Sequence, residues 1–467
     1  MENKRGNWGS TFGFLMAAVG SAVGLGNIWG FPYKMGANGG FAFLVLYLLL
    51  AIFVGFIAMV SELAIGRKTG KGVIGAYQDL SKKFKWIGWL GLISPFLIMT
   101  FYSVLGGHCI KYMVINLGDL FNAGFGSAGR DGATVFTDML TNQGEAIIYT
   151  LVFMVLTAII VLGGVKGGIE KFTTIAMPAL FVMLLIVIIR SVTLDGAVEG
   201  LKFMFAPNFE PLKTNFMSVL ATAGGQMFFS LSLGMGAMIT YGSYLKKSED
   251  IEKNALLVVC SDTLVALMAG LAVLPAAFAL GGEGAAMSGP KLLFITLQDV
   301  FANMGVVGPL FGVIFYFLVF IAAITSAISL VEAVSVHFMD MQVAKGKPAQ
   351  RTKWVVIVSI AIMILAAVVA ADGLGSNGLP QPLGFCWLDF MDLWSEGIMM
   401  PLGVLLMALC IGYEIKVSAI EGEITQEGNK FRIKKFYTVC IKVIVPIAMV
   451  LILAGQLDTF FGFGWFG

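Results

Sequence analysis

The chain has 467 residues, of which 58% are hydrophobic and only 12% are charged, and its formal net charge at pH 7 is +2. A soluble globular domain carries roughly 25% charged residues, so this composition excludes a chain that covers its surface with polar groups. No basic run alternates with aromatics and the five cysteines form no C-x-x-C pair, which argues against nucleic-acid binding, a zinc site and a disulfide framework.

Many apolar runs exceed the roughly 18 residues that a membrane-spanning helix needs. We therefore predict an all-α membrane protein with eleven transmembrane helices in one domain, residues 1–457. The predicted spans are 11–36, 41–66, 87–117, 146–163, 172–191, 216–244, 253–281, 307–341, 354–371, 391–414 and 436–457.

Most of the 30 basic residues lie in connections on the side of the N-terminus. Because cytoplasmic loops carry the excess of Lys and Arg, we expect a multi-pass protein of the cell (inner) membrane with a cytoplasmic N-terminus. An odd number of spans then leaves the C-terminus outside, in the extracellular or periplasmic space. Of the outer connections, 118–145 is rich in Gly and Asp and predicts irregular structure, whereas "KLLFITLQDVF" within 282–306 predicts a helix beside the membrane.

The first span contains "AAVGSAVGLGNIWGFPY", which places small and polar residues in mid-membrane: Gly20, Ser21, Gly24, Gly26 and Asn27. Small residues also let membrane helices pack closely, so glycine alone has an ordinary explanation. Packing does not explain a buried amide at the same depth. Backbone that is unwound within a membrane must line a cavity or meet an ion, so we predict a broken helix here.

The sixth span repeats this pattern in "SLSLGMG", residues 230–236. The two interruptions are five spans apart, so their helices cross the membrane in opposite directions. This predicts a 5+5 inverted repeat, residues 11–191 and 216–414, with 436–457 appended. The half-helix before each break points a negative dipole end into the membrane and the half-helix after it a positive end. Together they suit a zwitterion such as an amino acid.

These stretches carry a resemblance to a known family. "NWGSTFGFLMAAVGSAVGLGNIWGFPYKMGANGGFAF", "GGQMFFSLSLGMGAMITYGSY" and "AAITSAISLVEAVSVHFMD" resemble the first, sixth and eighth spans of the neurotransmitter:sodium symporters. The likeness is to their prokaryotic amino-acid branch, in particular the eleven-span bacterial multi-hydrophobic-amino-acid transporters. It implies the LeuT fold, with helices 1 and 6 unwound in mid-membrane.

The resemblance also implies the activity, which is sodium-coupled symport of an amino acid by alternating access, with a hydrophobic or aromatic substrate favoured. The alternative is a non-transporting amino-acid sensor or receptor on the same scaffold. An enzyme is disfavoured because we find neither H-E-x-x-H nor a nucleophile–base pair. The expected partners are the amino acid, sodium ions and the lipid bilayer, without nucleic acid, and the chain is expected to be a monomer or a weak homodimer.

By position, the resemblance implies two sodium sites. Site 1 would use Ala22, Asn27, Ser230 and Asp262. Site 2 would use Gly20, Val23, Ala322, Thr325 and Ser326. Positions i, i+3 and i+4 of a helix share one face, which lets the last three converge. Chloride-requiring relatives carry serine at the position of Ala266, so we expect chloride independence, although Tyr47 and Gln226 do match the relatives' anion region.

The implied substrate site combines backbone from the first break with side chains of spans three, six and eight. Its residues would be Ser21, Ala22, Gly24, Leu25, Gly26, Ile98, Tyr102, Phe229, Ser232, Met235, Ser326, Ala327 and Leu330. Monoamine carriers of the family bear aspartate at the position of Gly24, so glycine here favours a substrate that brings its own carboxylate. Met235 adds an adaptable wall to an apolar side-chain pocket.

The resemblance further implies gates on both sides of the site. The expected gate residues are Arg5, Trp8, Asp340 and Tyr244 on the inner side and Asp392 on the outer side. The relatives' basic partner of Asp392 is replaced by Gly30, and Lys34 one turn further is a candidate substitute. Glu62 matches a carboxylate that satisfies unwound backbone of the sixth span, whereas Glu332 is left open between a buried brace and a role in inward release.

Overall fold

The structure, a computed structural model, describes residues 7–127, 129–286 and 291–465. Every regular element in these ranges is helical, as predicted. The first half contains α1 (Thr11–Ala22), α2 (Phe31–Ala37), α3 (Phe41–Leu50), α4 (Phe56–Thr69), α5 (Val73–Leu80), α6 (Ile87–Leu120), α7 (Gly132–Thr141), α8 (Gln143–Leu162), α9 (Lys171–Val192), α10 (Ala197–Phe205) and α11 (Glu210–Thr214).

The second half contains the remaining helices. They are α12 (Phe216–Ser230), α13 (Ala237–Gly242), α14 (Ile251–Ala286), α15 (Leu297–Asn303), α16 (Gly308–Ala344), α17 (Arg351–Asp372), α18 (Trp387–Asp392), α19 (Met400–Leu409), α20 (Val417–Ile424), α21 (Lys434–Val439) and α22 (Val445–Phe461).

Short π-helical turns join many of these helices. They are η1 (Gly26–Gly30), η2 (Ala51–Gly55), η3 (Val165–Glu170), η4 (Leu292–Thr296), η7 (Leu393–Met399), η8 (Cys410–Glu414) and η10 (Cys440–Ile444). Three further single turns are of the 3₁₀ type. They are η5 (Gly305–Val307), η6 (Pro382–Gly384) and η9 (Gln426–Gly428).

Within the described ranges, nine helical stretches are long and apolar enough to cross a membrane. A tenth is added if α1 and the η1–α2 segment, bent by 46° at their break, form one span. The predicted sixth span is divided into α12 and α13, and each piece is too short to qualify alone. The total of eleven spans therefore stays a prediction, because the sixth is interrupted where its glycines and serines are concentrated.

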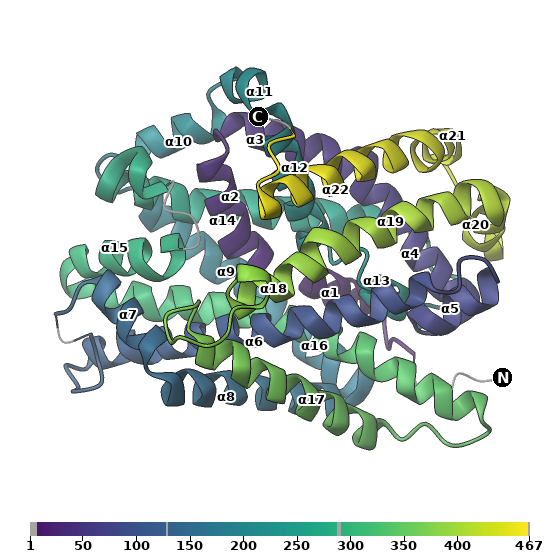
Figure 1. Cartoon of the computed structure of the whole chain (residues 1–467), viewed down its shortest axis with the longest axis horizontal. Helices are drawn as coiled ribbons and strands as arrows, with labels where there is room; N and C mark the ends of the chain where they lie inside the picture. Colours follow the sequence, from purple (N-terminus) through teal and green to yellow (C-terminus); the bar gives the residue numbers. More distant parts are fainter. Residues whose placement is uncertain (1–6, 128, 287–290, 466–467) are drawn as a thin grey trace.

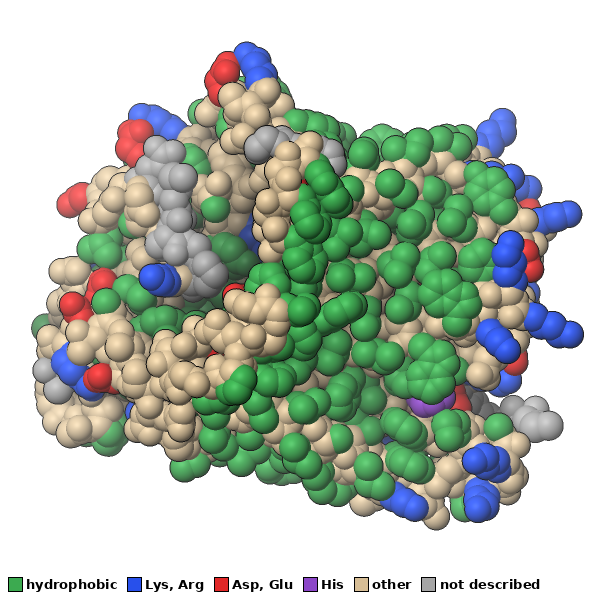
Figure 2. All heavy atoms as spheres, in the orientation of Figure 1, with side chains coloured by type: hydrophobic (Ala, Val, Ile, Leu, Met, Phe, Trp, Pro, Cys, Tyr) green, Lys and Arg blue, Asp and Glu red, His purple; other side chains and the backbone are tan. Residues whose placement is uncertain are grey.

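The long helices run roughly parallel along the horizontal axis of Figure 1. At the centre, α6 and α16 pack against each other more extensively than any other pair, while α8 and α17 pair at the lower edge. Apolar side chains cover the middle of the molecule in Figure 2, and Lys and Arg side chains gather at the right-hand end, where α5 and α20 lie. The belt between the two ends is the surface expected to face lipid.

One prediction about a connection is wrong. The loop 118–145 contains α7, a helix of ten residues, rather than only irregular chain. The Asp131 side chain accepts a hydrogen bond from the Thr134 N–H and so caps the first turn of this helix. The helical prediction for "KLLFITLQDVF" is confirmed, since η4 and α15 cover most of it.

Candidate binding site at two helix breaks

The first break follows Ala22, the last residue of α1, because Val23 adopts an extended backbone conformation (φ −73°, ψ 99°). Helical structure resumes at Gly26, in η1. The Asn27 side chain spans this gap, since its Oδ1 accepts a hydrogen bond from the Gly24 N–H at 3.0 Å. The amide predicted to be unusual at this depth thus satisfies one of the freed backbone groups.

The second break follows Ser230, the last residue of α12, and α13 begins at Ala237. Between them, Gly234 and Gly236 have φ of +78° and +71°, a left-handed region that favours glycine. The Glu62 Oε1 accepts a hydrogen bond from the Gly234 N–H at 2.7 Å. The structure therefore places Glu62 where the sequence predicted a carboxylate that satisfies unwound backbone.

A narrow cavity with a volume of about 10 Å³ lies between the two breaks. It is lined by residues of α1, α6, α12, α16 and the two breaks, namely Ser21, Ala22, Gly24, Gly26, Ile98, Tyr102, Phe229, Ser232, Met235, Ser326 and Leu330. Eleven of the thirteen predicted substrate residues thus line one cavity. Leu25 and Ala327 are buried beside it without lining it.

Polar groups converge on one wall of this cavity. The Leu25 N–H donates to the Tyr102 hydroxyl at 3.0 Å, so these two polar groups lie side by side on this wall. A Cβ at position 24 would lie 2.4 Å from Ser326 Oγ and 2.6 Å from the Tyr102 hydroxyl, so only glycine fits there. On another wall, the Ser232 hydroxyl donates to the Ser21 carbonyl at 2.8 Å.

The residues of predicted sodium site 2 surround the C-terminal end of α1. The Ser326 hydroxyl lies 3.2 Å, 3.0 Å and 3.4 Å from the carbonyl oxygens of Gly20, Ser21 and Val23. The Thr325 hydroxyl bonds the Ala322 carbonyl in its own helix at 3.0 Å. This oxygen-rich cluster is of the kind that binds hard cations.

The residues of predicted sodium site 1 meet around a fully buried carboxylate. Asp262 accepts hydrogen bonds from Asn27 Nδ2 at 2.7 Å and from the Ser230 hydroxyl at 2.9 Å. The Tyr47 hydroxyl also donates to it, at 3.3 Å. Ala22, the fourth predicted member, lines the central cavity. A buried carboxylate needs such donors or a cation to offset its desolvation.

A wide vestibule opens above the cavity, at the end of the molecule opposite the basic surface, with a volume of about 370 Å³. Phe229 lines both spaces and therefore separates them, and its ring lies 6.2 Å from that of Tyr102. Asp392, the predicted outer gate residue, lines the vestibule.

Lys34 pairs with Glu396, one turn beyond Asp392, rather than with Asp392 itself. The Nζ–Oε1 distance is 2.7 Å, and the side chains are only 14% and 10% exposed. A Cβ at Gly30 would lie 2.8 Å from Gln226 Oε1, so a side chain there would require the end of the Gln226 side chain to move. The sequence indicated Lys34 but missed Glu396. The available signal for Glu396 was its position four residues after Asp392, which places the two carboxylates one turn apart on a helix.

The end near the N-terminus is closed by Trp8. Its indole N–H donates to the Tyr241 carbonyl at 3.2 Å, and its ring packs edge-on against Tyr241 and Tyr244. Asp340 accepts a hydrogen bond from the Gly72 N–H. Arg5, its predicted ionic partner, lies outside the described residues.

Glu332, which the sequence left open, is the centre of a buried ion pair. Arg351 Nη2 lies 2.5 Å from its Oε2, and the Tyr244 hydroxyl donates to its Oε1 at 2.7 Å. Arg351 also donates to the Val161 carbonyl at the end of α8. The pair therefore ties α8, α16 and α17 to the tyrosine that packs on Trp8. Sequence reasoning missed Arg351, which is 19 residues from Glu332.

The chain is similar to known proteins over nearly its whole length. A model of the sodium:neurotransmitter symporter family matches residues 5–121 and 133–463. Two sodium-dependent transporters, both uncharacterized, are similar: YhdH of Bacillus subtilis is 36% identical over 97% of each chain, and one of Haemophilus influenzae is 33% identical over 98% of this chain and 99% of its own. The crystal structure of MhsT in complex with L-phenylalanine matches with a TM-score of 0.86 and 35% identity, over 97% of this chain and all of that one.

The buried pair of Glu332 and Arg351 gives a prediction about stability. Glu332→Gln should lower the unfolding free energy by about 3 kcal/mol, because it leaves a largely buried guanidinium without its partner. SDS titration in mixed micelles measures this change. The double variant Glu332→Gln/Arg351→Gln should recover part of the loss, and Glu421→Gln, which breaks the exposed pair with Lys434, should cost less than about 1 kcal/mol. Equal losses for Glu332→Gln and Glu421→Gln would contradict the assignment.

Proposed function

Because this chain belongs to the sodium:neurotransmitter symporter family, we propose that it imports a hydrophobic or aromatic L-amino acid together with sodium by alternating access. Membership of the family makes the protein a sodium-coupled membrane transporter and not an enzyme. The observation that carries the choice of substrate is the central cavity, where polar groups converge on one wall and apolar side chains form the others.

The backbone of an amino acid fits the polar wall. Its carboxylate would accept hydrogen bonds from the N–H groups of Leu25 and Gly26 and from the Tyr102 hydroxyl, at the positive end of a half-helix. Its ammonium would meet carbonyl oxygens of Ala22 and Phe229 and the Ser232 hydroxyl. Gly24 supports a substrate with its own carboxylate, since an aspartate side chain at this position would collide with Ser326 and Tyr102.

The side chain of the substrate would occupy the apolar part of the cavity, formed by Ile98, Phe229, Met235 and Leu330, with Ala327 behind them. Four of these five side chains are large and apolar, and the flexible side chain of Met235 adapts to different shapes. The structural match to MhsT, whose crystal structure contains L-phenylalanine, supports the same class of ligand. We therefore favour phenylalanine and similar amino acids over polar ones.

We place two sodium ions beside the substrate. Site 2 would combine the carbonyls of Gly20, Val23 and Ala322 with the hydroxyls of Thr325 and Ser326, with the Ser21 carbonyl also within reach of Ser326. Site 1 would combine Ala22, Asn27, Ser230 and Asp262. At a membrane potential of 100 mV, each inward charge contributes about 2.3 kcal/mol, so two ions would concentrate a neutral substrate steeply.

Chloride independence would follow from the position of Asp262. Its carboxylate already accepts hydrogen bonds from the hydroxyls of Tyr47 and Ser230 and from the amide of Asn27. A bound chloride would otherwise need these donors. Ala266, one turn further on α14, adds no hydroxyl. The protein thus carries its own negative charge beside the ions, and no chloride is needed to balance them.

The gates would work in turn on the two sides. Outside, the pair Lys34–Glu396 beside Asp392 would open and close the vestibule above Phe229. Inside, Trp8, Tyr244 and Asp340, with Arg5, would form the latch. The basic end of the molecule is then cytoplasmic in the cell membrane, since the positive-inside rule applies to the surface in Figure 2. The C-terminus would lie outside.

Residues 11–191 and 216–414 would act as inverted halves of a single domain, with 436–457 appended. All the proposed ligands belong to one chain, so a monomer suffices as the transporting unit.

Ligand binding tests the proposal directly. Added L-phenylalanine should raise the melting temperature of the purified protein by a few degrees in sodium but not in potassium, because substrate and ion stabilise the same folded state. A thermal-shift screen of the twenty amino acids in both salts measures this. The proposal fails if no amino acid stabilises the protein more in sodium than in potassium.

Ser326→Ala should weaken apparent sodium affinity about tenfold, the usual effect of losing a hydrogen-bonding ligand to a charge. Sodium titration of the phenylalanine-dependent melting shift gives the affinity. Ser335→Ala is the matched control, since Ser335 is a buried serine of the same helix outside the carbonyl cluster. If the titrations of the two variants coincide, Ser326 is not a sodium ligand.

Asp262→Ser should make uptake depend on chloride, with a loss of about tenfold in chloride-free buffer, because the donors that hold the carboxylate would be left without an acceptor. Radiolabelled uptake in chloride and in gluconate measures the difference. The wild type and Leu264→Ser, a change on the exposed side of the same helix, should be equally active in both. An Asp262→Ser variant that ignores chloride would refute the explanation.

A further inference from the structure

The carboxylate of Glu170 joins two elements at the end of the molecule that Trp8 closes. Glu170 is the last residue of η3, directly before α9, and is only 8% exposed. Its Oε2 accepts a hydrogen bond from the Gly9 N–H at 2.7 Å, and its Oε1 accepts one from the Ser10 hydroxyl at 3.0 Å. Ser10 is the N-cap of α1, and its hydroxyl accepts a hydrogen bond from the Gly13 N–H at 2.9 Å. One carboxylate therefore holds the start of α1 against the start of α9.

Glycines at the start of α1 leave room for this carboxylate. A Cβ at position 13 would lie 2.0 Å from Glu170 Oε1 and 2.4 Å from Glu170 Cγ, and a Cβ at position 9 would lie 3.1 Å from the same Oε1. A side chain at position 13 would therefore require Glu170 to move away from α1. The carboxylate also lies at the N-terminal end of the α1 dipole, where a negative charge is stabilised. Glu170 is not among the gate residues predicted from the sequence.

The helix that begins after Glu170 also covers the carbonyl cluster near the end of α1. Met177 of α9, about two turns after Glu170, is fully buried, and its Sδ would lie 3.2 Å from a Cβ at Gly20. The same Cβ would lie 3.3 Å from Thr325 Cβ, so Gly20 is in close contact with both α9 and α16. Gly20 and Thr325 belong to the proposed sodium site 2. The position of α9 therefore decides how closely this site is covered.

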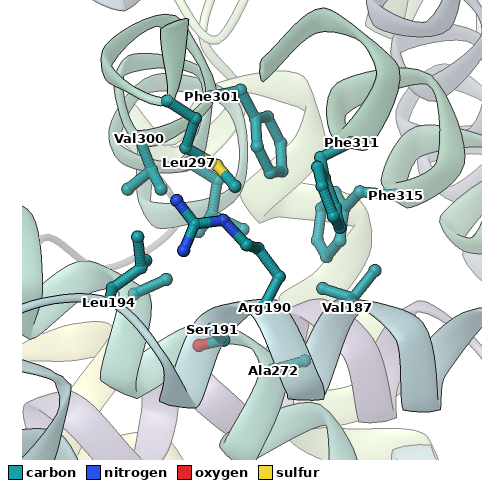
Figure 3. A pocket seen from close by; sticks show the side chains of 12 residues that line it. Val187, Arg190, Ser191, Leu194, Ala272, Leu297, Val300, Phe301, Phe311 and Phe315 are labelled. Atoms are coloured by element: carbon teal, nitrogen blue, oxygen red, sulfur yellow. The ribbon is translucent and has the colours of Figure 1, made fainter. Parts of the chain in front are cut away.

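The two ends of α9 are packed differently. At the end far from Glu170, Val187 and Ser191 of α9 share a gap with Phe301 of α15 and Phe315 of α16 (Figure 3). The volume of this gap is only about 10 Å³, which is room for about one water molecule. The far end of α9 is thus held in close apolar packing.

The end near Glu170 is packed less closely against α8, because a groove of about 320 Å³ lies between the two helices. The groove is lined by Ile159, Ile160, Gly163, Gly167, Gly168, Lys171, Phe172 and Ile175. Three of these residues are glycines, so little side-chain volume fills the space. Once the contacts of Glu170 break, the start of α9 has room to move toward α8 while its far end stays in place, which is a hinge motion.

We propose that Glu170 is a positioning residue of the inner gate, which transmits the opening of the latch at Trp8 to α9. The two residues that donate to its carboxylate directly follow Trp8, so displacement of this segment breaks both hydrogen bonds. The start of α9 then moves into the groove and Met177 withdraws from Gly20, which opens sodium site 2 toward the cytoplasm. This gating role rests on the proposed sodium-coupled transport, whereas the contact between α1 and α9 does not.

Amide hydrogen exchange of the purified full chain tests the contact itself. In potassium, Glu170→Gln should make the N–H groups of η3 exchange about tenfold faster than in the wild type, the usual effect of losing a hydrogen bond to a charged group on local opening. Glu249→Gln is the matched control, because Glu249 accepts a hydrogen bond from the Thr11 hydroxyl at 2.6 Å in an exposed position beside the same turn. If the two variants exchange equally, Glu170 does not hold α9 to α1.

A second variant moves the carboxylate without removing its charge. In Gly13→Ala the added methyl group displaces Glu170, so η3 should again exchange faster than in the wild type. Alanine favours a helix more than glycine does, so a weaker α1 could not explain this result. Unchanged exchange of η3 in Gly13→Ala would contradict the contact.

A sodium titration of the melting temperature tests the gating role. Glu170→Gln should weaken the apparent sodium affinity by up to about tenfold, because only the fraction of molecules with α9 in place retains site 2. Saturating sodium should restore the slow exchange of η3 in this variant, whereas a loss of packing alone would leave that exchange independent of sodium.

The gating role is wrong if Glu170→Gln titrates with sodium like the wild type, or if sodium leaves its η3 exchange fast. A wild type whose melting temperature does not respond to sodium would refute the proposed function and the gating role with it. The exchange measured in potassium would still decide whether Glu170 holds α9 to α1.

Discussion

The constraint on which this structure depends is that backbone polar groups inside a membrane need partners. The chain leaves α1 at Ala22 and α12 at Ser230, and both interruptions lie deep in the protein. Asn27 and Glu62 satisfy part of the freed backbone from side chains. The remaining carbonyl and N–H groups surround the central cavity and the carbonyl cluster at Ser326. In the proposed function, substrate and sodium complete this set of partners.

The same constraint explains how the site connects to the two ends of the molecule. Phe229 belongs to α12 and separates the cavity from the vestibule, while Tyr244 follows α13 and joins Trp8 to the Glu332–Arg351 pair. Both gates are thus attached to the pieces of one broken helix. A shift of those pieces around a bound ligand would reach both gates, and a ligand drives such a shift only through different affinities for the two states.

Much of this arrangement could be predicted from the sequence, because its signals are local. The glycines and serines at 230–236 predicted the second break. The spacing of Ala322, Thr325 and Ser326 predicted that three groups lie on one helix face. Partners that meet only through tertiary packing were missed. Glu396 is 362 residues from Lys34, and the only local signal for the pair was the position of Glu396 one turn beyond Asp392. The helix α7 was also missed, because a Gly- and Asp-rich composition hid the cap at Asp131.

Uptake by reconstituted protein tests the account most directly, because binding alone would also be seen in a sensor. Proteoliposomes that contain the protein should accumulate radiolabelled L-phenylalanine above the external concentration when sodium is higher outside. The accumulation should disappear when potassium replaces sodium. Binding of phenylalanine without uptake, or uptake that ignores the sodium gradient, would contradict the claim that the two helix breaks form a sodium-coupled transport site.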